Sequence, residues 1–183
     1  MKKISLIATG IATGLVAVAI GTYLIAGNAQ REEADNQGVS NIKQLVHDFS
    51  TRKATAQSAS ITSTQLSVSE DATTTKTYDL PANEFFVSIA PYMEQTHPCA
   101  THSLTGCQGE MKDEEFNVTI HDSAGNSVMN KALVKSQSNG FIDLWLPRDK
   151  TYSVTVEHKG KTAKSQISTF ENDDTCITTM QLG

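Results

Sequence analysis

The sequence has few cysteines and no cluster of positive charge, and each of these shortages excludes a class of protein. Three cysteines occur in 183 residues, none before position 99, which is too few for a disulfide-stabilised scaffold. Their odd number leaves at least one thiol without an intrachain disulfide partner. The 15 Lys and Arg against 20 Asp and Glu give a formal net charge of −5. Because phosphate neutralisation needs clustered Lys and Arg, no nucleic-acid partner is expected.

The motifs of several common enzyme classes are also missing from the sequence. It contains no HExxH pattern, no P-loop, no Gly-rich phosphate loop and no Ser-His-Asp order, so we do not expect a hydrolase. It contains no Cys-x-x-Cys pair, which excludes a zinc ribbon and a thioredoxin-type motif. Hydrophobic residues make up 38% of the chain, which is enough to form a folded core. The length of 183 residues corresponds to one domain or two small ones.

Residues 1–29 are predicted to be a signal peptide or a membrane anchor. Two lysines precede an uncharged segment from Ile4 to Ala26, which is long for a signal peptide and about long enough to cross a bilayer. In the first interpretation, Gly27 and Ala29 are the small residues of a cleavage site. In the second, the segment stays as an anchor and is the only contact with the membrane. Both interpretations place the rest of the chain outside the cytoplasm.

Residues 30–80 are predicted to form a polar linker and a small N-terminal subdomain. After the polar residues 30–40, apolar residues recur at the spacing of a short amphipathic helix. The stretch 50–77, rich in Ser and Thr, is expected to be mostly loop, with one short strand around Leu66 and a second from Lys76 to Leu80. The helical stripe consists of Ile42, Leu45, Val46 and Phe49.

Residues 81–183 show the alternation of apolar and polar residues that is typical of β-strands, with turn signals about every 8–12 residues. We predict a mostly β (α+β) fold, with a small N-terminal α/β subdomain and a C-terminal antiparallel β-sandwich-like domain. The run NGFIDLWLPRDKTYSVTV resembles transthyretin-like sandwiches, which implies a fold but no chemistry. The expected strands are Phe85–Ile89, Phe116–Ile120, Val128–Val134, Phe141–Leu146, Tyr152–Val156, Ile167–Phe170 and Cys176–Leu182.

The most informative segment places two histidines and two cysteines within eleven positions, at His97, Cys99, His102 and Cys107. The third cysteine, Cys176, follows about seventy residues later. Cu(I) favours thiolate, with imidazole as a second choice, and needs two or three ligands, whereas Zn(II) favours four in a tetrahedron. The residue types suit either metal. A structural disulfide is the competing interpretation, because thiols in an oxidising compartment usually pair, although one thiol would remain without a use.

The segments FFVSIAPYMEQTHPCATHSLTGCQGE, NGFIDLWLPR, GKTA and DDTCITTMQL resemble the CueP family of exported bacterial copper-binding proteins. The resemblance is dense over residues 80–183 and loose before them. It implies that copper is the metal and that residues 81–183 are the metal-binding domain, and it suggests a homodimer formed through the N-terminal region. The implied thiol and imidazole set is Cys99, His102, Cys107 and Cys176, with His97 as a weaker candidate.

We therefore expect an extracytoplasmic copper-binding protein that sequesters Cu(I), contributes to copper tolerance and delivers copper to an exported enzyme. Cys99, Cys107 and Cys176 are expected to hold one Cu(I) together, with His102 as a supporting ligand and zinc as the second choice of metal. Two alternatives stay open. One is a thiol-based Cu(II) reductase or disulfide-exchange protein. The other is a disulfide-stapled, transthyretin-like interaction module without metal.

Several residues near this segment are expected to have ordinary structural roles. Met93 and Met180 are expected to pack in the β core, although thioethers suit Cu(I). His158 adjoins a turn and is expected to be solvated. The acidic run that begins at Glu110 is expected to form a solvated face. Trp145 is expected in the core or at a contact between domains.

Overall fold

The computed structural model describes residues 38–183. Residues 42–183 form one compact unit, and residues 38–41 belong to the preceding unit. The expected signal peptide or membrane anchor at residues 1–29 lies outside the described residues. A search of the described part of the chain finds no helix with the length and hydropathy of a membrane span.

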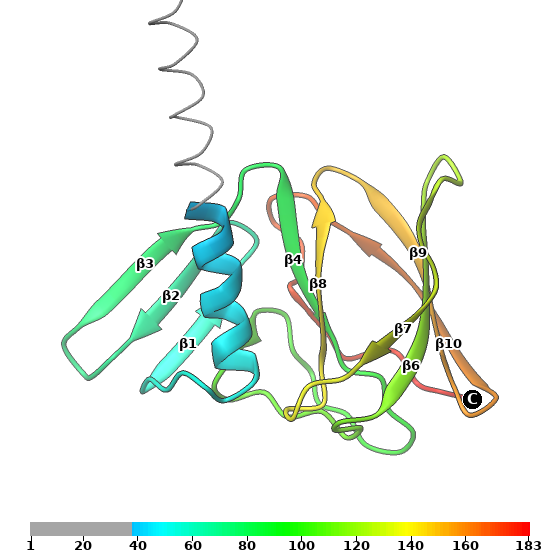
Figure 1. Ribbon diagram of the computed structural model, residues 1–183, viewed down its shortest axis with the longest axis horizontal. Coiled ribbons are helices and arrows are strands. Elements are labelled where there is room, and N and C mark those ends of the chain that lie inside the picture. Colours follow the sequence, from blue (N-terminus) through cyan, green and yellow to red (C-terminus); the bar gives the residue numbers. More distant parts are fainter. Residues whose placement is uncertain (1–37) are drawn as a thin grey trace, which may run out of the picture. The chain divides into compact units, whose positions relative to one another are not determined.

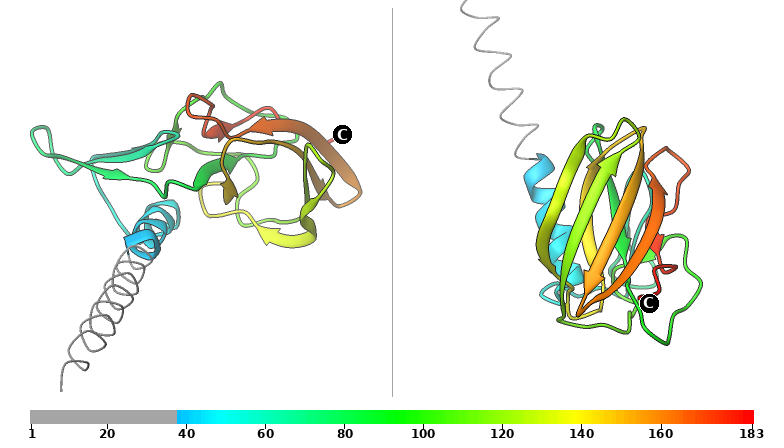
Figure 2. Two further views of the ribbon diagram at one scale, coloured as in Figure 1. Left: turned by 90° about the horizontal axis from the view of Figure 1, so that it is seen from above. Right: turned by 90° about the vertical axis from the view of Figure 1, so that its right-hand side faces the viewer.

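Three sheets and one helix make up the described chain (Figures 1 and 2). The helix covers residues 38–50, and the strands are β1 Ser58–Ile61, β2 Gln65–Ser69, β3 Thr75–Asp79, β4 Glu84–Ile89, β5 His102–Ser103, β6 Glu115–Asp122, β7 Ser127–Lys135, β8 Ile142–Pro147, β9 Thr151–His158, β10 Lys161–Ser168 and β11 Cys176–Ile177. The N-terminal sheet has the order β3-β2-β1-β5, the middle sheet β11-β4-β8 and the C-terminal sheet β10-β9-β6-β7. The predicted mostly β fold is confirmed.

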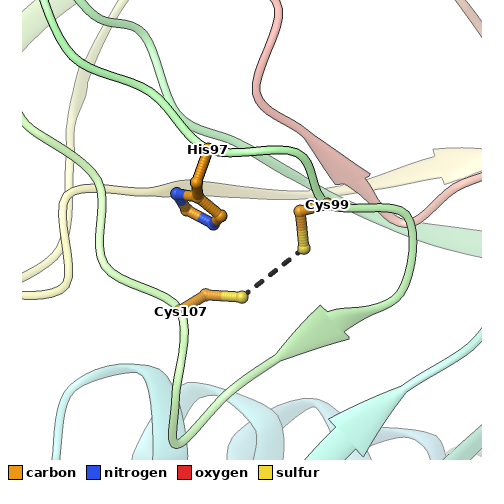
Figure 3. A group of neighbouring side chains, drawn as sticks. All are labelled: His97, Cys99 and Cys107. Atoms are coloured by element: carbon orange, nitrogen blue, oxygen red, sulfur yellow. Dashed lines mark hydrogen bonds between the residues drawn. The ribbon is translucent and has the colours of Figure 1, made fainter.

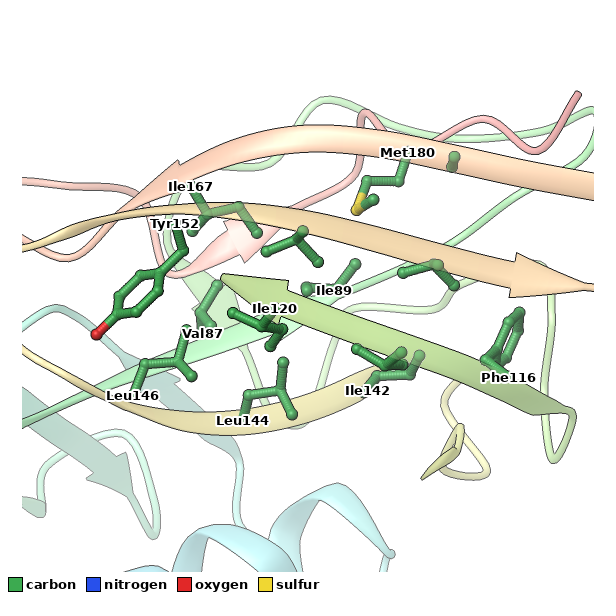
Figure 4. Close-up of a cluster of buried hydrophobic side chains, with 14 of the residues drawn as sticks. Val87, Ile89, Phe116, Ile120, Ile142, Leu144, Leu146, Tyr152, Ile167 and Met180 are labelled. Carbon is green, nitrogen blue, oxygen red and sulfur yellow. The ribbon is translucent and has the colours of Figure 1, made fainter. Parts of the chain in front are cut away.

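Strand β4 of the middle sheet is buried on both faces, so it belongs to two cores. Phe85 and Val87 of β4 lie in the C-terminal core, which fills the space toward the C-terminal sheet (Figure 4). Phe86, between them, lies in the N-terminal core, where its ring meets Trp145 of β8 at a centroid distance of 5.2 Å. A strand covered on both faces becomes continuously apolar, and β4 is buried throughout Phe85–Ile89.

The C-terminal core is built from alternating side chains of β6 and β9 packed on the apolar face of the middle sheet. Met180 is buried in this core and Met93 packs against it, which confirms their predicted packing role. Burial of this apolar surface is the main term that stabilises the fold. The largest fully buried side chains of this core include Phe116, Ile120, Ile142, Tyr152 and Ile167.

The N-terminal core confirms the predicted amphipathic helix. Ile42, Val46 and Phe49 are buried, one turn apart on the same face, and they pack with Ile61 and Leu66 of the N-terminal sheet. An isolated helix of this length is only marginally stable in water, so its packing against the N-terminal sheet supplies the stability that it lacks alone.

Residues 50–77 contain one strand more than predicted. Strands β2 and β3 appear where short strands were predicted, but β1 also pairs with β2 over four residues. Strand β1 was not predicted from the sequence because it has only two apolar residues, Ala59 and Ile61, both fully buried. Tertiary pairing overrides the weak local preference of a chain rich in Ser and Thr.

The end of the chain contains less strand than predicted. β10 ends at Ser168, so Phe170 lies beyond it and is 46% exposed. Only Cys176 and Ile177 of the expected last strand form β11, and an isolated bridge joins Gln181 to Tyr92. The short β11 is nevertheless the element that matters for the site.

Candidate metal centre

The loop between β4 and β6 carries four of the five predicted ligands and is tied to the N-terminal sheet. His102 begins β5 and pairs with Ile61 of β1 in an antiparallel register. The Leu104 N–H then donates to the Ala59 carbonyl at 2.8 Å. His102 therefore has the fixed position of a strand residue, although it comes from a long loop.

Cys176 belongs to a different sheet. It begins β11, which pairs in parallel with β4 and places Cys176 opposite Ser88. The Ala100 carbonyl accepts hydrogen bonds from the N–H groups of Thr175 and Cys176, both at 3.0 Å. These two bonds hold the loop with the first two cysteines directly beside the third.

The hydroxyl of Thr175 links the two sheets at this point. It donates to the Ile61 carbonyl at 2.6 Å and accepts the His102 N–H at 3.0 Å. Thr175 is 1% exposed, so these two hydrogen bonds are made away from solvent. Thr175 thus positions His102 relative to Cys176, its own neighbour in the chain.

The five predicted ligands lie together in two overlapping groups. The outer group contains His97, Cys99 and Cys107, and the inner group contains His102, Cys107 and Cys176. Within each group the ligand atoms lie within 4.8 Å of one another, and Cys107 is shared. The sulfur atoms of Cys99 and Cys107 are 3.5 Å apart and point into the same space as the His97 ring (Figure 3). All three cysteines are free thiols.

The two groups differ in access to solvent. All three residues of the outer group are half-buried, whereas His102 and Cys176 of the inner group are buried. Beneath both lies the fully buried ring of Phe141, whose centroid is 4.5 Å from that of His102 and 6.4 Å from that of His97. Phe141 clusters with Ala90 and the three cysteines. The sulfur atoms therefore lie at the edge of an apolar floor.

His102 is fully buried, and neither of its ring nitrogens has a hydrogen-bond partner among the described residues. A buried polar group without a partner costs about 1–3 kcal/mol. A ring nitrogen of His102 is grouped with the sulfur atoms of Cys107 and Cys176, so a metal ion there would satisfy it. The unpartnered, buried imidazole therefore fits the role of a metal ligand.

The thiols of this cluster have unequal acidity. The hydrogen bond from the Cys176 thiol lowers the pKa of Cys107, against the opposing effect of burial. The Ser103 N–H, which is 3.4 Å from the Cys107 sulfur, lowers this pKa further. The same thiol–thiol bond raises the pKa of Cys176, and burial raises that of Cys99. Hydrogen bonds from its neighbours therefore favour the thiolate form of Cys107.

Glu110 is exposed, as the predicted solvated face requires, but its carboxylate also has a structural role. One of its carboxylate oxygens accepts hydrogen bonds from three successive N–H groups, those of Met93, Glu94 and Gln95, at 3.0, 3.0 and 2.9 Å. These bonds lower the pKa of the Glu110 carboxyl. Glu110 therefore holds residues 93–95, near the start of the loop, close to residue 110 near its end.

A contact between two glycines closes the same loop against the turn before Phe141. The Gly109 N–H donates to the Asn139 carbonyl at 2.6 Å. A Cβ atom on Gly109 would lie 2.6 Å from the Gly140 carbonyl oxygen, so only glycine permits this approach. Gly140 also has a φ of 83°, which favours glycine. The predicted Asn139-Gly140 turn therefore helps to place the floor of the site.

The residues predicted as donors lie close together, but several residues that position them were not predicted. Thr175, Glu110 and Phe141 were not recognised, although the Thr-Cys pair before β11 and the Gly-Phe pair after the turn were the available signals. The prediction of a solvated His158 is wrong. It is 8% exposed, and its Nδ1 lies 2.8 Å from the Glu115 carbonyl.

Two comparisons with known proteins point to one family. The model of a family described as "Periplasmic copper-binding protein CueP" matches residues 39–181. A solved crystal structure of "S.CueP" is similar at 39% sequence identity with a TM-score of 0.73, covering 78% of this chain and 89% of that chain. No curated protein matches the sequence.

We predict that Glu110 braces the loop only while it is ionised. Its folded-state pKa is lowered, so the stabilisation is complete above the unfolded value of about 4.3 and is lost as the pH falls through the folded value. In NMR titrations, the amide protons of Met93, Glu94 and Gln95 should shift together below pH ~4. Glu110→Gln should abolish this titration, whereas Glu115→Gln should leave it intact. A titration that persists in Glu110→Gln would assign it to another group.

We also predict that Thr175 positions the inner group. Thr175→Val removes both hydroxyl bonds and should lower the affinity for a soft ion such as Ag(I) about 10- to 100-fold, with a stability loss of about 1–3 kcal/mol. Thr175→Ser keeps the hydroxyl and should restore the affinity. Competition with a chelator and thermal unfolding measure the two effects. A Thr175→Val protein that is less stable but binds Ag(I) normally would show that Thr175 only stabilises the fold.

Proposed function

The chain belongs to the CueP family of periplasmic copper-binding proteins, and we propose that it binds Cu(I) outside the cytoplasm through Cys99, Cys107, Cys176, His102 and His97. One observation carries this proposal. Three free thiols and two imidazoles from distant parts of the chain converge at one apolar site. The unpartnered nitrogens of buried His102 support a ligand role for that residue.

The donor set favours Cu(I) over zinc and over harder ions. Each group offers two sulfur atoms and one nitrogen, and neither includes a carboxylate. Soft thiolates select Cu(I), for which three donors suffice, whereas structural zinc sites are almost always four-coordinate. Zinc remains the second choice for a site with this many thiolates.

We propose that this site serves copper tolerance and copper delivery. The buried Cys176 and His102 shield a bound ion from solvent, which favours sequestration. The half-buried Cys99 and Cys107 leave one side open to an incoming ligand. A recipient, such as an exported copper enzyme, could then take the ion by exchange of one ligand at a time.

The proposal extends to the assembly and location of the protein. We infer a homodimer formed through the N-terminal region, where the edge strand β3 pairs only with β2 among the described strands.

The N-terminal segment would export the chain and then either be cleaved or remain as its anchor.

Single substitutions of the ligands test the copper site. Cys99→Ser, Cys107→Ser and Cys176→Ser should each lower Cu(I) affinity more than His102→Ala, because thiolates are the stronger ligands for this ion. Competition with a Cu(I) chelator under anaerobic, reducing conditions measures the affinities.

The matched control is the double variant Glu114→Gln, Glu115→Gln. Its carboxylates are hard donors outside both groups, so its affinity should change by well under about tenfold. If Cys176→Ser competes as well as the wild type, the distant cysteine is not a ligand.

A second candidate function is the reduction of Cu(II), which the 3.5 Å separation of the Cys99 and Cys107 sulfur atoms favours. A disulfide bond is about 2.05 Å long, so a small movement would allow it to form. The two thiolates would each give one electron, two Cu(II) ions would become two Cu(I) ions, and one S–S bond would form.

Anaerobic addition of Cu(II) to the reduced protein distinguishes this activity from simple binding. Colorimetric detection of Cu(I) and a thiol count should show two Cu(I) formed for each pair of thiols lost. Cys176→Ser should retain the reaction and Cys107→Ser should lose it. Equal Cu(I) formation by Cys107→Ser and wild type would refute a reductase role for this pair.

A further inference from the structure

The geometry points to a centre for two soft metal ions that share the thiolate of Cys107. This inference rests on the proposed function and changes its stoichiometry. One ion would lie in the outer group, between His97, Cys99 and Cys107 (Figure 3). The other would lie in the inner group, between His102, Cys107 and Cys176.

The arrangement of donors supports two positions. A trigonal site with bonds of about 2.0–2.3 Å places its donor atoms roughly 3.5–4 Å apart. Each group keeps its donors within 4.8 Å of one another, so a small contraction would close it around an ion. Each group also has the same composition of two sulfur atoms and one nitrogen, and Cys107 is the only residue common to both.

Charge supports the second ion. Three thiolates around a single Cu(I) would leave a net charge of −2 beside the apolar ring of Phe141. The carboxylate of Asp174, which raises the pKa of Cys99, adds to this negative potential. A second Cu(I) would reduce the net charge of the centre to −1, and buried charge that is not compensated is costly.

The two positions would differ in exchange. The inner ion would be held by buried His102 and Cys176, on two different sheets. The outer ion would be held by residues that are all half-buried. The outer ion would therefore exchange with external ligands first, while the inner ion would remain and keep the Cys107 thiolate in place. In this arrangement His97 is a ligand, whereas in a single site of three cysteines and His102 it would bind no metal.

Anaerobic titration of the full-length, reduced protein with Cu(I) tests the inference, with Ag(I) as a probe that has no accessible higher oxidation state under these conditions. The wild type should saturate at two equivalents. His97→Ala should saturate at one equivalent, with the affinity for that remaining ion changed by less than about tenfold. The control is His121→Ala, a half-buried histidine outside both groups, which should keep two equivalents.

X-ray absorption spectroscopy of the copper-loaded protein provides an independent readout. The wild type should show a copper neighbour at short range, and His97→Ala should lack it. Saturation of wild type and His97→Ala at one equivalent alike, without a copper neighbour, would overturn the two-ion centre but leave Cu(I) binding intact. Failure of the wild type to bind either ion would instead refute the proposed function.

Discussion

Two hydrogen bonds to the carbonyl of Ala100 hold the candidate metal centre together. They come from the backbone N–H groups of Thr175 and Cys176, at 3.0 Å each. Backbone bonds of this kind do not depend on the metal, so they place the loop beside β11 in advance. A site assembled before the ion arrives loses less conformational entropy on binding than a loop that must first be ordered.

The candidate ligands come from two neighbouring sheets and a loop. His102 belongs to the N-terminal sheet, Cys176 belongs to the middle sheet, and Cys107 lies on the loop between β5 and β6. Because β4 of the middle sheet contributes side chains to both cores, the cores fix these sheets relative to each other. A metal bound by all three residues would cross-link the sheets, and binding to the folded state alone would stabilise that state.

Predictions from periodicity were correct where burial is one-sided. The helix with Ile42, Val46 and Phe49 and the alternating strands β6 and β9 follow from the sequence, because each buries one regular face. The same reasoning failed for β1, where the buried residues are few, and it did not find the hydrogen bonds of Glu110 to three N–H groups about sixteen residues earlier. Local patterns carry no information about such partners.

The sequence by itself determined which donors are available. Thiol and imidazole are the chemistry of a soft-metal site wherever they are placed, and the spacing from His97 to Cys107 already put four of them on one loop. Only the tertiary structure decided that Cys107 lies between two groups, that Phe141 forms the floor and that Thr175 ties His102 to Cys176. The type of a ligand is a property of one residue, whereas the distance between ligands depends on how strands far apart in the chain pair.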